Sequence, residues 1–178
     1  MHRNGHYGLA LLVFAPLAFL LDLNHAASGA LIGAVIVAGT APIPDLDQRI
    51  PFLTHRGFTH TVWFLLGASL ITGAGTWFAI IRADHAIPNL DAPAATSHPI
   101  LLAVTVGSLV GLGLATHLLG DVITPMGIKP FAPLSDVKYT LDLTTSKNRV
   151  VNMGLFISGL AATGAALYLP HVLALSSS

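Results

Sequence analysis

The stretch PDLDQRIPFLTHRGFTHT, residues 44–61, places two aspartates, two histidines and two arginines between long apolar segments. Charged and imidazole side chains are costly in and near a bilayer, so their presence among apolar segments indicates a functional site. A second polar group, His117 and Asp121, ends another apolar segment. We therefore expect the apolar segments to form a membrane scaffold that brings the two polar groups together.

The composition favours a membrane protein. Of the 178 residues, 53% are hydrophobic and 9% are charged, whereas about 25% are charged in an average soluble domain. The formal net charge is zero, so no basic field would recruit nucleic acid, and we expect no nucleic acid partner. The chain has no cysteine and no glutamate, so a metal site would have to use aspartate and histidine.

Apolar segments cover residues 8–21, 26–41, 62–81, 100–119 and 153–175. The last three reach the ~20 residues that cross a bilayer core. The first two are shorter, and would cross as a helical hairpin with local thinning of the bilayer. We predict an all-α polytopic membrane helix bundle of about five transmembrane helices, with residues 1–178 as a single integral membrane domain. Alternatively, Leu9–Leu21 would be the hydrophobic region of a signal peptide.

The basic residues predict an orientation. If all five segments cross, the N-terminus, residues 42–61 and residues 121–152 lie on one side and carry every lysine and arginine except Arg82. The positive-inside rule assigns that side to the cytoplasm. We therefore expect a multi-pass protein of the cell (inner or plasma) membrane, with the N-terminus and the polar loops cytoplasmic.

The polar loop between the second and third segments contains four candidate metal ligands. Asp45 and Asp47 are two residues apart, so in an extended or turn conformation both carboxylates would face one cation; a solvated Asx turn is the alternative. His55 and His60 follow, and Gly57 permits a bend that would bring both imidazoles onto one metal. A helix beginning near Val62 would also favour an anion such as phosphate.

The fourth segment supplies a second pair of ligands. His117 and Asp121 are four residues apart and so lie on one face of a helix. They would bind a metal together, or the carboxylate would orient the imidazole; an intrahelical pair without metal is the alternative. His6, just before the first segment, is expected on the same side of the membrane.

These motifs together resemble a known family. Gly5-His6, PDLD at residues 44–47, HRGFTH at residues 55–60 and HLLGDVITPMG at residues 117–127 are similar in kind and order to the motifs of the YdjM-type family. Its members are inner-membrane proteins described as metal-dependent hydrolases and as LexA-binding. The resemblance runs from residue 5 to about residue 133 and implies a multi-pass membrane protein that hydrolyses its substrate with a metal. The LexA link is not carried over to this chain.

The leading hypothesis is a membrane-embedded metal-dependent hydrolase. Zinc is the expected ion, with manganese or iron as alternatives. An aspartate, Asp45 or Asp47, would act as general base, and Arg56 would bind an anionic group, because guanidinium matches phosphate geometry. In the bilayer this favours a lipid-linked phosphoester, an anionic lipid-like substrate. A metal transporter and a non-catalytic membrane scaffold or regulatory protein are the alternatives. The expected metal ligands are His6, Asp45, Asp47, His55, His60, His117 and Asp121.

Overall fold

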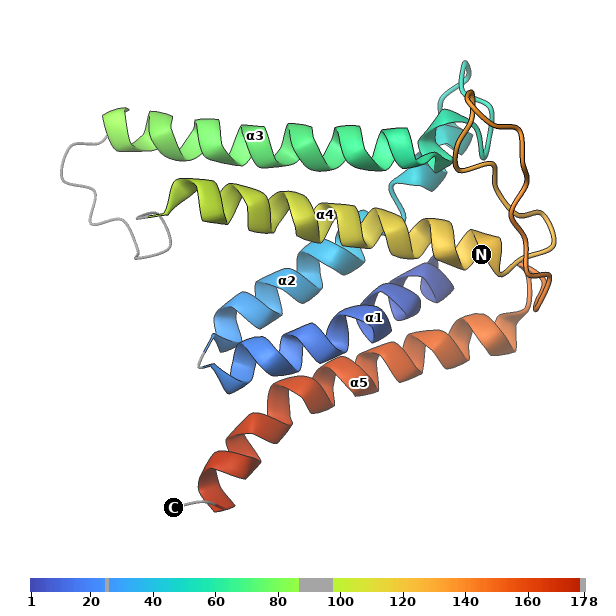
Figure 1. The fold of residues 1–178 in the computed structure, drawn as a ribbon. Coiled ribbons are helices and arrows are strands. Elements are labelled where there is room, and N and C mark those ends of the chain that lie inside the picture. The colour runs from blue at the N-terminus through green and yellow to red at the C-terminus, as the bar shows by residue number, and fades with distance from the viewer. Residues whose placement is uncertain (25, 87–97, 177–178) are drawn as a thin grey trace.

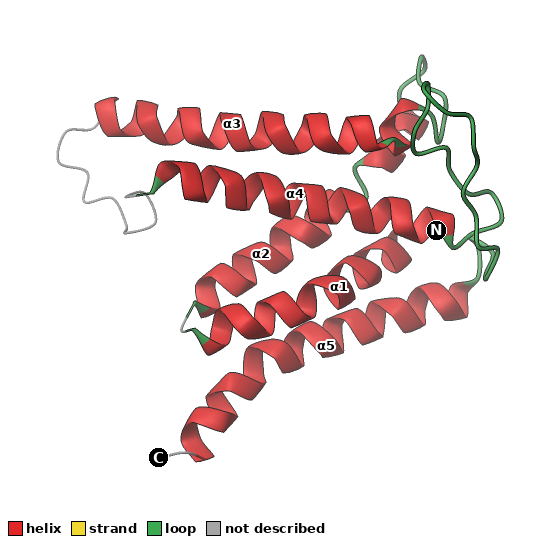
Figure 2. Cartoon of the chain, viewed as in Figure 1, coloured by secondary structure: helices red, strands yellow, loops and turns green. Residues whose placement is uncertain are grey.

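The regular structure of this protein is helical (Figures 1 and 2). The computed structural model describes residues 1–24, 26–86 and 98–176. Within them, five segments are long and apolar enough to cross a bilayer, so the prediction of an all-α polytopic bundle is confirmed. The elements are α1 (Arg3–Leu23), α2 (Ala27–Thr40), the 3-10 helices η1 (Pro44–Arg49) and η2 (Phe58–His60), α3 (Val62–Ala86), α4 (Pro99–Val122) and α5 (Arg149–Ser176).

The first two membrane segments are longer than their apolar patterns predict. Helix α1 begins at Arg3 rather than Gly8 and therefore includes His6. The second segment continues from α2 into η1, and Ala27–Arg49 has 23 residues. Each reaches the ~20 residues that a crossing needs, so thinning of the bilayer is not required. Helix α1 exceeds its apolar pattern because polar residues at its start continue the backbone hydrogen bonds of the helix, whereas α2 ends at Thr40 and turn residues lead from it into η1.

The helices pack as two pairs joined by α2. Helices α1 and α5 lie side by side, as do α3 and α4, and α2 contacts both α1 and α4 (Figure 1). The α1–α5 contact needs Gly8 and Gly159, because a Cβ atom at either position would collide with the backbone of the other helix. Small residues of this kind let membrane helices approach closely. Beneath this contact, Phe14 is fully buried against alanines of α1 and α2.

The long loops gather at the end of the bundle where the N-terminus lies (Figure 2). Two backbone hydrogen bonds tie them down, from Val62 N to Pro130 O and from Leu141 N to Val122 O, at 2.9 and 2.7 Å. Both polar groups are therefore at the same end of the bundle. That this end faces the cytoplasm stays a prediction from the charge pattern.

Candidate metal centre

Four elements supply the polar side chains at this end of the bundle. Asp45 comes from η1, His60 from η2, His6 from α1, and both His117 and Asp121 from the last two turns of α4. The local sequence helps to place the loop that contains η1 and η2. Proline at the start of η1 has the backbone angle of a first helical residue. The hydroxyl of Thr61 accepts the backbone N–H of Phe64 at 3.2 Å and caps α3.

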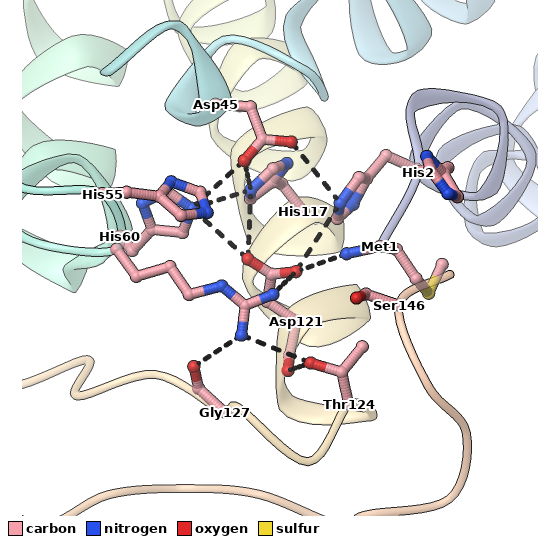
Figure 3. Close-up of polar contacts among 12 residues, drawn as sticks. Met1, His2, Asp45, His55, His60, His117, Asp121, Thr124, Gly127 and Ser146 are labelled. Atoms are coloured by element: carbon pink, nitrogen blue, oxygen red, sulfur yellow. Dashed lines mark hydrogen bonds and ion pairs between the residues drawn. The ribbon is translucent and has the colours of Figure 1, made fainter. Parts of the chain in front are cut away.

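One atom from each of Asp45, His60, His117 and Asp121 lies within 4.8 Å of the others. Figure 3 shows these four side chains directed toward one another. The two Nε2 atoms of His60 and His117 are 3.1 Å apart. Asp121 Oδ2 is 3.3 and 3.5 Å from these two nitrogens, and Asp45 Oδ1 is 3.6 and 3.7 Å from them. A single cation between them would contact two imidazoles and two carboxylates.

His6 completes this group. Its ring stacks on that of His117, with centroids 3.9 Å apart and an interplanar angle of 14°. His6 Nε2 is 3.7 Å from Asp121 Oδ1 and 4.0 Å from Asp45 Oδ2. The side chain is fully buried and neither ring nitrogen has a hydrogen-bond partner. A buried polar atom without a partner costs free energy, so a bound cation would satisfy an otherwise unfavourable arrangement.

Asp47 and His55 lie on the other side of His60. The buried Asp47 carboxylate accepts hydrogen bonds from the Thr59 hydroxyl at 2.9 Å and from the Arg56 backbone N–H at 3.1 Å. Its other oxygen is 2.9 Å from His55 Nδ1. Because Thr59 gives its one proton to Asp47, Thr59 Oγ1 accepts the Nδ1 proton of His60, 3.0 Å away. The Nε2 lone pair of His60 is then free to bind a metal.

Asp47, His55 and His60 also form a second set of possible ligands, again with one atom each within 4.8 Å. The two sets share His60 and contain six of the seven predicted ligands, and the seventh, His6, lies beside the first set with its ring stacked on His117. His55 is the exposed member of the second set.

Arg56 contacts a predicted ligand. Its guanidinium donates to Asp121 Oδ1 at 2.8 Å, to the Gly127 carbonyl at 2.9 Å and to Thr124 Oγ1 at 3.3 Å. Its backbone has a φ of 60°, in the left-handed region, which is uncommon for a residue other than glycine. The sequence suggested Gly57 as the site of the bend, but it is Arg56 that takes the left-handed conformation.

The electrostatics of His60 reflect the carboxylates around it. Burial lowers the pKa of His60, but the carboxylates of Asp121 and Asp45, which accept from its ring, raise the pKa, and the net pKa lies above its ordinary value. The same carboxylates that favour an imidazolium would favour a metal cation in its place.

Two contacts at this site involve groups that the motifs did not indicate. The amino group of Met1 donates to Asp121 Oδ1 at 2.7 Å. The backbone N–H of His2 donates to Asn152 Oδ1 at 3.0 Å, so α5 helps to hold the start of the chain. In the sequence, the one feature that could have pointed to Asn152 is that it is a polar residue at the edge of an apolar segment.

Comparison with known proteins identifies the family of this chain. No curated protein and no solved structure matches this chain significantly. The family model described as YdjM inner membrane protein matches residues 1–177. The chain therefore belongs to the YdjM inner membrane protein family.

Proposed function

We propose that this protein is a membrane-embedded metal-dependent hydrolase with one divalent ion bound by Asp45, His60, His117 and Asp121. The observation that carries the proposal is the convergence of these four side chains from separate elements into one buried group. His6 would be a fifth ligand. Imidazole and carboxylate donors without thiolate suit zinc, which is the expected ion, and also manganese or iron.

The ion, when bound, would activate a water molecule and polarise the bond to be hydrolysed. The chain's own residues have three further tasks. Asp47 and Thr59 orient His60 through its Nδ1 atom. Arg56 orients Asp121 and adds a positive charge beside it. Asp45 is the one partly exposed carboxylate of the group. Its Oδ1 lies toward His60 and His117 and would bind the ion, and we assign the proton of the attacking water to its other oxygen, Oδ2.

Asp47 and Arg56 would then be positioning residues rather than groups that touch the substrate. Both side chains have several contacts within the protein, which favours this assignment over the roles of base and anion binder that the sequence suggested. The leaving group would take its proton from Asp45 at the end of the reaction, which restores the carboxylate.

We further propose that the substrate is a lipid-linked phosphoester. The site lies at the end of a bundle of membrane-spanning helices, and the loops around it combine basic and apolar side chains. Phe52 is 94% exposed and Leu134 is 78% exposed, while Arg49, Lys138 and Lys147 lie in the same loops. A surface that is both basic and apolar fits the headgroup region of an anionic membrane.

Metal content and turnover of the full chain in detergent test the proposal. We expect about one divalent ion per chain, and hydrolysis of dibutyryl phosphatidic acid that stops when a chelator removes the ion. His117→Ala and Asp121→Asn should lose both the ion and turnover, whereas His98→Ala, a matched change at an exposed histidine, should keep both. A folded His117→Ala protein that retains its ion and its turnover would refute the assignment.

The position of the ligands argues against a transporter. A transported ion needs binding groups near the middle of the bilayer, but His117 and Asp121 lie in the last two turns of α4. A purely structural metal, as in a scaffold, would bind in the same assay but would support no turnover.

A further inference from the structure

A groove of about 820 Å³ lies between α3 and α4, which run side by side (Figure 1). At its bottom the two helices are in close contact, because a Cβ atom on Gly107 would meet the backbone of α3 at Ser69 and Gly73. Its sides are large apolar side chains that include Leu70, Val104 and Trp77. Leu70 is 71% exposed, so the groove opens away from the helix bundle.

The dimensions of the groove suit one alkyl chain. On α3 it is lined from Leu65 to Trp77, which is roughly 18 Å at 1.5 Å per residue. One leaflet of a bilayer has a hydrocarbon depth of about 15 Å. In the apolar window of α3 no residue is buried by the rest of the protein, so in a membrane this side of the helix is in contact with lipid.

One end of the groove lies on the side of the candidate metal centre. Its lining begins at Leu65, five residues after His60, and at Gly111, six residues before His117. These two histidines have their Nε2 atoms 3.1 Å apart. His117 lies in α4 itself, and His60 lies in η2, just before α3 begins at Val62, so a chain lying in the groove would have its headgroup near the level of the metal centre.

We propose that the α3–α4 groove binds one long alkyl chain of the substrate, so that the substrate is a membrane phospholipid or a related lipid phosphoester rather than a soluble one. This inference rests on the proposed hydrolase function and adds to it a binding site for the alkyl chain of the lipid substrate. The spacing of Gly107 and Gly111 is also a pattern by which membrane helices associate. The nearness of one end of the groove to the metal centre, along both α3 and α4, favours the lipid chain over a second copy of the protein.

A binding experiment tests the groove without relying on catalysis. The chain has two tryptophans, and a Trp63→Phe background leaves Trp77, which lines the groove. Phosphatidic acid with brominated acyl chains, titrated into the protein in detergent, should quench Trp77 with a saturable curve. Ala74→Phe and Ser108→Phe fill the groove and should weaken this binding at least tenfold. The exposed Ala79 and Ala115 do not line it, so Ala79→Phe and Ala115→Phe are matched controls with unchanged binding.

A turnover experiment separates the groove from the catalytic proposal. In the wild-type protein, kcat/KM should be higher for dipalmitoyl than for dibutyryl phosphatidic acid. In the two groove-filling variants, kcat/KM should fall at least tenfold for dipalmitoyl phosphatidic acid and should not change for dibutyryl phosphatidic acid. If the wild type hydrolyses neither substrate but still shows saturable quenching that Ser108→Phe abolishes, the hydrolase proposal fails and the alkyl-chain site stands.

Three results would overturn the groove proposal. The first is quenching that does not saturate. The second is quenching and chain-length preference that both groove-filling variants leave unchanged. The third is a Ser108→Phe chain that changes from dimer to monomer in chemical cross-linking, which would assign the groove to a second copy. Thermal unfolding checks that the variants fold. If a phenylalanine variant does not fold, Ser108→Leu is used in its place, with the same expected losses of lipid binding and of turnover on the long substrate.

Discussion

Helices α1 and α3 have the same mean hydropathy but very different surroundings. In α1, 50% of the most apolar window is buried inside the protein, and in α3 none of it is. Helix α1 contacts α2, α4 and α5, whereas α3 contacts α4 and η2. Hydropathy thus indicates that a segment crosses the membrane, and its neighbours decide whether it is a core helix or a lipid-facing one. Four predictions, from the largest expected effect to the smallest, test this contrast.

The largest effect is expected from Gly8→Leu in α1. The new side chain would collide with the backbone of α5, which cannot move aside as a flexible side chain does. Overpacking of a well-packed core costs about 1–3 kcal/mol or more, and we expect a loss at the upper end of that range. The measurement is the thermal unfolding midpoint in detergent.

The matched control is Gly75→Leu in α3, where nothing lies within 4 Å of an added Cβ atom. This variant should be as stable as the wild type or more stable, since glycine is a poor helix former by about 1 kcal/mol. Equal destabilisation by the two substitutions would contradict the division into a core and a lipid-facing helix.

A second pair of variants compares two phenylalanines. Phe14 in α1 is fully buried, whereas Phe78 in α3 is 55% exposed. Phe14→Ala leaves a cavity and should cost on the order of 3 kcal/mol. Phe78→Ala should cost less than about 1 kcal/mol, because lipid can fill the space. Unfolding in sodium dodecyl sulfate measures both free energies, and a larger loss for Phe78→Ala would reverse the comparison.

The third prediction concerns the part of α1 that reaches the metal centre. His6→Ala removes a buried imidazole that contacts both carboxylates, and should weaken metal binding at least tenfold, the low end of what loss of a supporting partner of a metal ligand costs. Competition with a chelating dye measures the affinity. His98→Ala, an exposed histidine at the start of α4, should leave it unchanged. Unaltered affinity in a folded His6→Ala protein would remove His6 from the ligand set.

The smallest effect is expected at an exposed ion pair outside both helices. A hydrogen bond from Lys129 lowers the pKa of Asp136. A lowered carboxyl pKa can add stability at neutral pH, which is lost as the pH falls through the folded-state pKa. Both side chains are well exposed, so solvent screens the pair. Asp136→Asn should therefore unfold at the same temperature as the wild type, both at pH 7 and at pH 3. A loss as large as that of Phe78→Ala at pH 7 would show that this loop is part of the folded core.

The candidate site was predictable in large part because its ligands stand out in an apolar sequence. His55, His60, His117 and Asp121 are polar residues at the borders of apolar segments, and a charged group there is costly without a partner. The different positions of the two aspartates in the site were not predictable. Spacing alone treats Asp45 and Asp47 alike, yet Asp45 lies beside the Nε2 atom of His60 and Asp47 lies beside its Nδ1 atom.

The contact of Arg56 with Asp121 also could not be predicted from the sequence. The two residues are 65 positions apart, and no periodicity connects a loop residue to a helix so distant in the chain. The left-handed backbone at Arg56 was not predictable either, since the glycine next to it would have been the expected choice.

The sequence alone determined the membrane-spanning character, the approximate limits of the helices and the residue types of the candidate site, because each depends on local hydrophobicity or on residue chemistry. Only the tertiary structure decided that α1 lies in the core while α3 faces lipid, and that His6, Asp45, His60 and the α4 pair meet at one point. Between helices in lipid there is little hydrophobic driving force, so close packing at residues such as Gly8 and Gly159 selects the neighbours. The shapes of the helix surfaces make that selection, and hydropathy contains no information about shape.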